Sequence, residues 1–202
     1  MATKTLSGIR ALIRQFLKDE FQSGVPLDWK NDELDLYIQD ILSEISERVP
    51  YRVKETLTTT ASSRELDISS IEDLLSIDKL EYKTGQDPRD YRNFNEIDAD
   101  TIEIDTTLTP SADENVYVYC HKLHQLTESS STLSPQLERI LVLGVTAQAA
   151  IAKAQSHINE VNIGGTRAPA DMQAWGTGKL ALYRADLKRL MKPKTYRTYS
   201  KD

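Results

Sequence analysis

Three side chains that commonly bind metals lie close together in this sequence, at Cys120, His121 and His124, and His157 follows further along the chain. Cysteine and histidine are the usual ligands of structural zinc. However, the alternating residues Glu114 to Leu123 predict a β-strand, in which neighbouring side chains point to opposite faces. Cys120 and His121 would therefore face apart, so we predict no metal site here and interpret the cysteine as a small inward-packing side chain.

Four carboxylates, at Asp98, Asp100, Glu103 and Asp105, alternate in a way that could line them along one face of the predicted sheet. Aligned carboxylates can perform acid–base chemistry or hold a hard cation, but the loop spacing and turn glycine of an EF-hand are absent from this segment. We predict a solvated acidic strand face. The alternative is a hydrolase built on these carboxylates and the histidines, which metal-dependent turnover would reveal.

The sequence contains none of the common signatures of catalytic or nucleotide-binding sites. No GxSxG, Walker loop, dinucleotide glycine fingerprint or HExxH occurs, and Gly164 and Gly165 lack the lysine and helix start of a phosphate loop. We therefore predict a protein without catalytic activity and without a cofactor.

Charge and tyrosine are concentrated at the C-terminus. Residues 1–134 hold 14 Lys/Arg and 26 Asp/Glu, whereas residues 135–202 hold 11 and 5. Cations interleaved with aromatic rings suit a phosphate backbone or an acidic protein groove, although solubility and the helix dipole are simpler explanations for such a tail. As partner-binding residues we predict Lys192, Lys194, Tyr196, Arg197, Tyr199 and Lys201.

Helical spacing of apolar residues predicts four helices. They cover residues 6–21, a segment from Asp28 or Asn31 to Pro50, a segment opened by Ser134 as cap and Pro135, and a last segment from about Pro169. Many alanines at residues 147–154 would let a neighbouring helix approach closely. The residues predicted to pack the helices together are Trp29, Leu34, Ile38, Ile41, Leu141, Val145, Trp175, Tyr183 and Leu187.

Between the helices, alternating patterns predict an antiparallel sheet or small sandwich. We expect a hairpin of residues 51–59 with a short strand at Leu66 and Ile68, a helical turn at residues 69–75, a strand at residues 76–83, a long connection at residues 84–100, and strands at residues 101–105 and 115–123. The fold class is therefore α+β. Residues 1–50 and 134–192 would form a helical frame, residues 51–133 a β-rich insertion, and residues 193–202 an extended basic tail.

No apolar run approaches the roughly 20 residues of a membrane-spanning helix, and the first residues lack an apolar signal core. We therefore expect a cytosolic protein that makes no contact with a membrane.

The order of these elements resembles the head-to-tail connector adaptors, or head-completion proteins, of tailed bacteriophages. The resemblance rests on WKNDELDLY at residues 29–37, VYVYCHKLHQLT at residues 116–127, the alanine-rich residues 147–154, and LALYRADLKRLM at residues 180–191. It covers most of the chain. The family has a helical bundle with a β-rich insertion and no enzymatic activity.

The resemblance implies a structural protein of the virion neck, assembled in the host cytoplasm. Such adaptors form a ring, usually of twelve subunits, below the portal protein; a tail, stopper or nozzle protein binds the opposite face, and genomic DNA passes through the lumen. We expect the basic tail to reach the portal, and acidic surfaces of the N-terminal two-thirds to face the DNA channel or neighbouring subunits. The alternative is a non-enzymatic nucleic-acid-binding accessory protein that uses its basic C-terminus.

Overall fold

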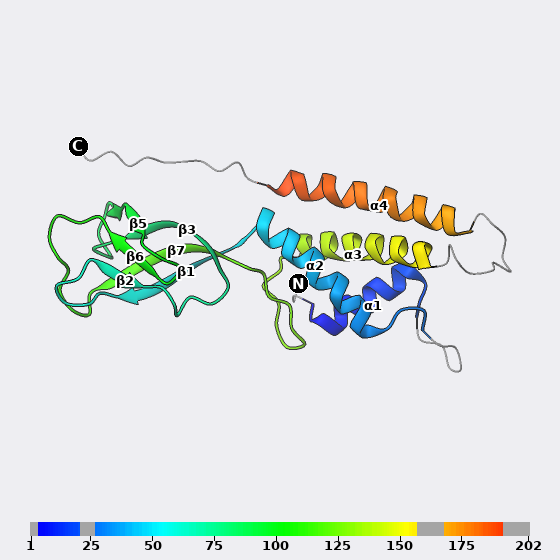
Figure 1. The fold of residues 1–202 in the computed structure, drawn as a ribbon, viewed down its shortest axis with the longest axis horizontal. Coiled ribbons are helices and arrows are strands. Elements are labelled where there is room, and N and C mark those ends of the chain that lie inside the picture. Colours follow the sequence, from blue (N-terminus) through cyan, green and yellow to red (C-terminus); the bar gives the residue numbers. More distant parts are fainter. Residues whose placement is uncertain (1–3, 21–26, 157–167, 192–202) are drawn as a thin grey trace. The chain divides into compact units, whose positions relative to one another are not determined.

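The computed structural model of the chain describes residues 4–20, 27–156 and 168–191. The elements within them are α1 (Leu6–Leu17), α2 (Asn31–Arg48), β1 (Tyr51–Thr58), β2 (Glu65–Asp67), β3 (Leu74–Glu81), β4 (Tyr91–Arg92), β5 (Phe94–Glu96), β6 (Thr101–Ile104), β7 (Asn115–Lys122), α3 (Pro135–Ser156) and α4 (Ala168–Leu190). Two helices precede the strands and two follow them, so the predicted α+β fold is confirmed (Figure 1).

The chain divides into two compact units, which we call the helical unit (residues 4–49 and 124–191) and the β unit (residues 50–123). The predicted insertion ended at residue 133, but residues 124–133 belong to the helical unit. The backbone N–H of His124 donates to Ser46 Oγ at 2.9 Å, and its ring Nε2 donates to the Val49 carbonyl at 2.9 Å. Leu133 is buried in the core of the helices. These contacts fix the returning chain against the end of α2.

Helix α1 is shorter than predicted. Lys18 adopts a left-handed conformation with φ of 60°, and its N–H bonds to the carbonyls of the last turn, so the helix ends at Leu17. Ile9 and Ile13 are fully buried, as the helical spacing predicted, but Phe16 is 56% exposed. The apolar stripe of α1 is therefore narrower than its sequence suggests.

Helix α3 is the central element of the helical unit and is buried along most of its length. Ser134 Oγ accepts the N–H of Leu137 at 3.3 Å and Pro135 is the first helical residue, as predicted. At Gly144 the neighbouring helices come so close that a Cβ atom would lie 2.9 Å from Ile41 of α2 and 2.9 Å from Tyr183 of α4. The absence of a side chain at Gly144 is what permits this packing.

The β unit contains two antiparallel sheets that share one core. The four-stranded sheet has the order β1-β7-β3-β4 and the three-stranded sheet has the order β2-β6-β5. Inward-facing residues of both sheets form a single cluster that includes Leu66, Ile102, Leu80, Val116 and Val118. The unit is therefore a small sandwich, one of the two arrangements predicted.

Three local expectations for the β unit are wrong. β1 pairs with β7, and β2 pairs with β6 in the other sheet, so the chain crosses between sheets where a hairpin was predicted. Residues 69–73 form turns without a helix, and β3 begins directly after them. The presumed connection at residues 84–100 contains the short strands β4 and β5. In each case the local sequence pattern agreed with the predicted element, but pairing with strands distant in sequence determined the observed structure.

Within the described segments, no helix combines the length and the apolar character needed to cross a bilayer.

Candidate binding surfaces

The residues with metal-binding side chains do not converge. Cys120 is buried in the core of the β unit, and burial raises the pKa of its thiol. His121 lies on the opposite side of the strand, where its Nδ1 is 3.1 Å from Ser76 Oγ. His124 belongs to the helical unit, and His157 lies outside the described residues. In the described parts of the chain, no three His, Cys, Asp or Glu side chains are grouped to hold a metal ion.

The four alternating carboxylates separate into a turn and a strand face. Asp98 and Asp100 lie in the turn before β6, where Asp98 Oδ1 accepts the N–H of Asp100 at 2.9 Å. This is the hydrogen bond of an Asx-turn, and it explains the residue type without a ligand. Glu103 and Asp105 alternate with buried Ile102 and Ile104, so they point away from the core.

The predicted partner-binding residues Lys192, Lys194, Tyr196, Arg197, Tyr199 and Lys201 lie outside the described residues. Their role therefore stays a prediction from the sequence.

Eight of the nine residues predicted to pack the helices together do so, and the ninth does not. Trp29, Leu34, Ile38, Ile41, Leu141, Val145, Tyr183 and Leu187 are all buried in the helical core. Trp175 is 41% exposed, because the buried side of α4 follows Met172, Gly176, Leu180, Tyr183 and Leu187. The close contact of Gly176 with α3, where a Cβ would lie 2.8 Å from Ile151, rotates Trp175 toward solvent.

A set of basic and aromatic side chains covers the outer side of the four-stranded sheet. In β7 the residues Val116, Val118 and Cys120 are buried, so Tyr117 and Tyr119 point outward. The strand register places Thr56 and Lys54 of β1 opposite them, followed by Arg52 opposite His121. On the other side of β7, Lys79 of β3 is paired with Tyr119. We call Arg52, Lys54, Lys79, Tyr117 and Tyr119 the basic face.

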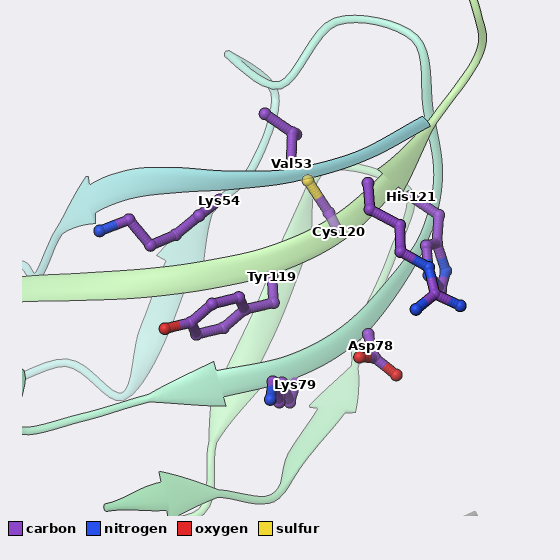
Figure 2. A pocket seen from close by; sticks show the side chains of 8 residues that line it. Val53, Lys54, Asp78, Lys79, Tyr119, Cys120 and His121 are labelled. Atoms are coloured by element: carbon purple, nitrogen blue, oxygen red, sulfur yellow. The ribbon is translucent and has the colours of Figure 1, made fainter. Parts of the chain in front are cut away.

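The lysines of the basic face lie over the aromatic rings. Lys54 Nζ is 3.8 Å from the centre of the Tyr117 ring, and Lys79 Nζ is 4.3 Å from that of Tyr91 and 4.8 Å from that of Tyr119. Figure 2 shows Lys54, Tyr119 and Lys79 on three adjacent strands. Cation–π contacts of this kind hold the ammonium groups at the sheet surface while leaving them charged. Lys54, Lys79 and Tyr119 line a shallow hollow of about 320 Å³, together with Arg52 and the carboxylate of Asp78.

Hydrogen bonds fix the central ring of this surface. The Tyr119 hydroxyl donates to Glu81 Oε2 at 2.8 Å and accepts from Arg89 Nη1 at 3.1 Å. Burial, and then the hydrogen bond to Glu81, raise the pKa of Tyr119 to about 12, so the phenol stays protonated at neutral pH. Glu81 is only 2% exposed, which withdraws its negative charge from the surface. The basic face therefore presents cations and neutral rings.

The three-stranded sheet presents the opposite charge. Glu65 of β2 is paired directly with Glu103 of β6, and Leu66, Ile102 and Ile104 between the carboxylates point into the core. We call Glu65, Asp67, Glu103 and Asp105 the acidic face. No lysine or arginine nitrogen of the described residues lies within 4.0 Å of these four carboxylates.

From the sequence, Glu103 and Asp105 of the acidic face could be identified, whereas Glu65, Asp67 and the whole basic face were missed. The available signal was the spacing of Tyr117 and Tyr119, which places two rings on the face opposite Cys120. The lysines come from strands 40 to 65 positions away in sequence, and only the pairing of β1 and β3 with β7 brings them there.

Comparison with models of protein families and with curated protein sequences finds no match.

Proposed function

We propose that this protein is a non-enzymatic assembly component of a tailed-phage virion, a ring-forming adaptor that docks below the portal protein and links the head to the tail. DNA would pass through its lumen without sequence-specific binding, and a tail, stopper or nozzle protein would bind the other face. The neck of the virion is its proposed location.

The observation that carries this proposal is the way the β unit is inserted. The helical unit is built from both ends of the chain, and the two connections to the β unit leave it at adjoining points, because His124 bonds to the carbonyl of Val49. A frame of helices with one β insertion is what the resemblance to connector adaptors implies. In a closed ring of identical subunits the same frame repeats in each copy, and surfaces outside the contacts between copies remain for other partners.

Exposed apolar side chains on the helices support an assembly role. Leu36 is 63% exposed on α2, and Trp175 and Leu182 are 41% and 57% exposed on α4. Positions 175 and 182 are seven apart and so lie on one side of their helix. Contacts with neighbouring subunits would bury these side chains, since interfaces favour large apolar anchors.

The test is electron microscopy of the full chain with purified portal rings. We expect an added ring of density beneath the portal, coaxial with its channel. If the protein stays unbound under conditions in which the portal is intact, the adaptor proposal is wrong. Within this proposal the basic tail contacts the portal, so a chain ending at Met191 should not dock, while Tyr196→Phe with Tyr199→Phe, which keeps the rings and charge, should dock normally.

The second candidate is a nucleic-acid-binding accessory protein. The observation that favours it is the basic face, because exposed cations beside aromatic rings suit a sugar–phosphate chain. For this function, the affinity of the isolated protein for DNA should fall steeply with salt. Weak binding with little dependence on salt would exclude it.

A further inference from the structure

The charges of the β unit are divided between its two sheets. Strands β2, β5 and β6 hold four acidic residues and no Lys or Arg, whereas strands β1, β3, β4 and β7 hold five basic residues and three acidic ones. The two outer surfaces are on opposite sides of the sandwich, because both sheets direct their apolar residues into one shared core. Each β unit is therefore acidic on one face and basic on the other.

Ion pairs among the described residues neutralise neither face. Of the three acidic residues on the four-stranded sheet, Glu81 is buried against Tyr119 and Glu55 pairs with Lys122 at 3.3 Å. The third, Asp78, is exposed and lines the same hollow as the cations of the basic face, but it forms no ion pair with a described residue. No carboxylate of the described residues lies within 4.0 Å of Arg52, Lys54 or Lys79. These cations are available to a negatively charged partner.

The acidic face holds like charges in direct opposition. Glu65 and Glu103 are cross-strand partners, and Asp67 and Asp105 flank that pair on the same face. Like charges opposite each other destabilise an antiparallel pair, and cations supplied from outside would relieve the repulsion. The acidic face is thus complementary in charge to the basic face of the same protein.

We propose that the basic face of one copy binds the acidic face of the next copy. This inference rests on the ring assembly proposed above and names the contact between neighbouring β units. Because the two surfaces differ and lie on opposite sides of the sandwich, the contact is heterologous and repeats from copy to copy, and such a contact forms a ring when the rotation between successive copies closes.

A second copy fits this pair of faces better than a nucleic acid does. Residues 50–123 hold 8 Lys/Arg and 16 Asp/Glu, so the β unit as a whole repels a polyanion. A nucleic acid would use the basic face and leave the acidic face without a partner. Between neighbouring copies, one repeated contact gives both the basic face and the acidic face a partner.

Charge reversal on each face provides the test. The basic-face variant carries Arg52→Glu and Lys54→Glu, and the acidic-face variant carries Glu65→Lys, Asp67→Lys and Asp105→Lys; all five residues are exposed, so the fold should tolerate the changes. Sedimentation velocity of the full chain at low ionic strength would measure self-association. We expect the unmodified protein to associate, and each variant alone to associate at least about tenfold more weakly, because like charges then oppose each other.

Mixing the two variants gives the decisive result. The first variant has two acidic faces and the second has two basic faces, so an equimolar mixture should associate like the unmodified protein. A control with Lys30→Glu and Arg139→Glu changes the net charge as much as the basic-face variant does but alters exposed residues of the helical unit, and it should associate normally.

The remaining outcomes overturn the inference. It fails if the mixture stays monomeric, if the control loses association as strongly as the face variants, or if the basic-face variant loses only DNA binding. Portal docking separates the two proposals: if both face variants still form a ring on the portal, the contact is wrong and the adaptor role stands. If the mixture associates but the unmodified protein never docks, the contact stands and the adaptor role is wrong.

Discussion

At the scale of single residues, the tightest constraint in the helical unit is the missing side chain at Gly144. Three helices meet there, and both nearest atoms belong to buried side chains of Ile41 and Tyr183. Tyr183 is also held by a 3.0 Å hydrogen bond from its hydroxyl to Glu44, so its ring has little freedom to move aside. The residue type at position 144 is therefore dictated by packing.

We expect Gly144→Ala to lower the free energy of unfolding by roughly 1 kcal/mol. Overpacking a core costs about 1–3 kcal/mol, and the better helix propensity of alanine returns only about 1 kcal/mol. Urea denaturation measures the change. Gly178→Ala is the matched control, because a Cβ at Gly178 in α4 meets nothing within 4 Å, and it should stabilise the protein slightly. Equal effects of the two substitutions would contradict the packing argument.

His124 makes the helical unit sensitive to acid. Burial lowers the pKa of its imidazole, and the neutral ring donates to Val49 through Nε2, with Thr132 Oγ1 3.1 Å from Nδ1. The unfolded chain binds this proton near pH 6.5, whereas the folded chain binds it only at lower pH. The contribution to stability is therefore complete above about pH 6.5 and is lost as the pH falls through the lowered pKa.

The measurement is the urea midpoint between about pH 5 and pH 8. The midpoint of the unmodified protein should fall on the acidic side, and His124→Gln, which cannot titrate, should reduce that fall. His121→Gln is the control, because His121 lies at the surface of the β unit and should leave the pH dependence in place. An unchanged slope in His124→Gln would exclude this residue as its source.

At the scale of elements, helix α3 is defined by its first residues. The hydroxyl of Ser134 satisfies one of the free N–H groups of the first turn, and Pro135 supplies a φ angle already suited to a helix. Since α3 contacts all three other helices, fraying at its start would expose the core that they share.

Ser134→Ala should lower the free energy of unfolding by about 1 kcal/mol, the typical contribution of a capping hydroxyl. Thermal and urea denaturation both report this change. Thr177→Ala removes an exposed hydroxyl from the interior of α4 and should be neutral or slightly stabilising, since alanine favours the helix. A loss in Thr177→Ala as large as that in Ser134→Ala would show that the cap is not the cause.

The helices could be predicted from the sequence because their determinants are local. Apolar spacing located α2, α3 and α4, and the Ser134–Pro135 pair gave the start of α3 correctly. The exposure of Trp175 could not be predicted, because it depends on the contact of Gly176 with a helix about 25 positions earlier in the chain. The pairing of β1 with β7 was likewise missed, because the two strands are separated by more than 50 residues and the sequence of neither strand identifies its partner.

The two candidate surfaces also differ in how far they could be predicted from local sequence. Half of the acidic face was visible, because Glu103 and Asp105 alternate with the apolar residues of β6, whereas Glu65 and Asp67 are brought beside them only by the pairing of β2 with β6. The basic face was hidden, since Lys54, Tyr119 and Lys79 come from three strands that meet only through pairing. A surface built from several strands can be predicted only when the pairing register of those strands is known, and the sequence alone does not determine that register.

At the scale of the whole molecule, the β unit should fold when separated from the helices. It has its own core, and its first and last strands pair from Tyr51 with Lys122 to Thr58 with Asn115, so both ends of the segment meet at one place. We expect a chain of residues 50–123 to unfold cooperatively and to show dispersed amide signals in NMR spectra. A control chain of the same residues with Val118→Asp, which places a charge in the core, should be unfolded. Lack of structure in both chains would show that the β unit depends on the helices.

The paired connections at Val49 and His124 also determine how the protein responds to a protease. A domain at the end of a chain is released by one cut in its linker. Here the β unit is joined through residues 49–51 and 122–124, and β1 remains hydrogen-bonded to β7 along its whole length. After a single nick in either connection the β unit is still attached through the other, so its release requires two cleavages.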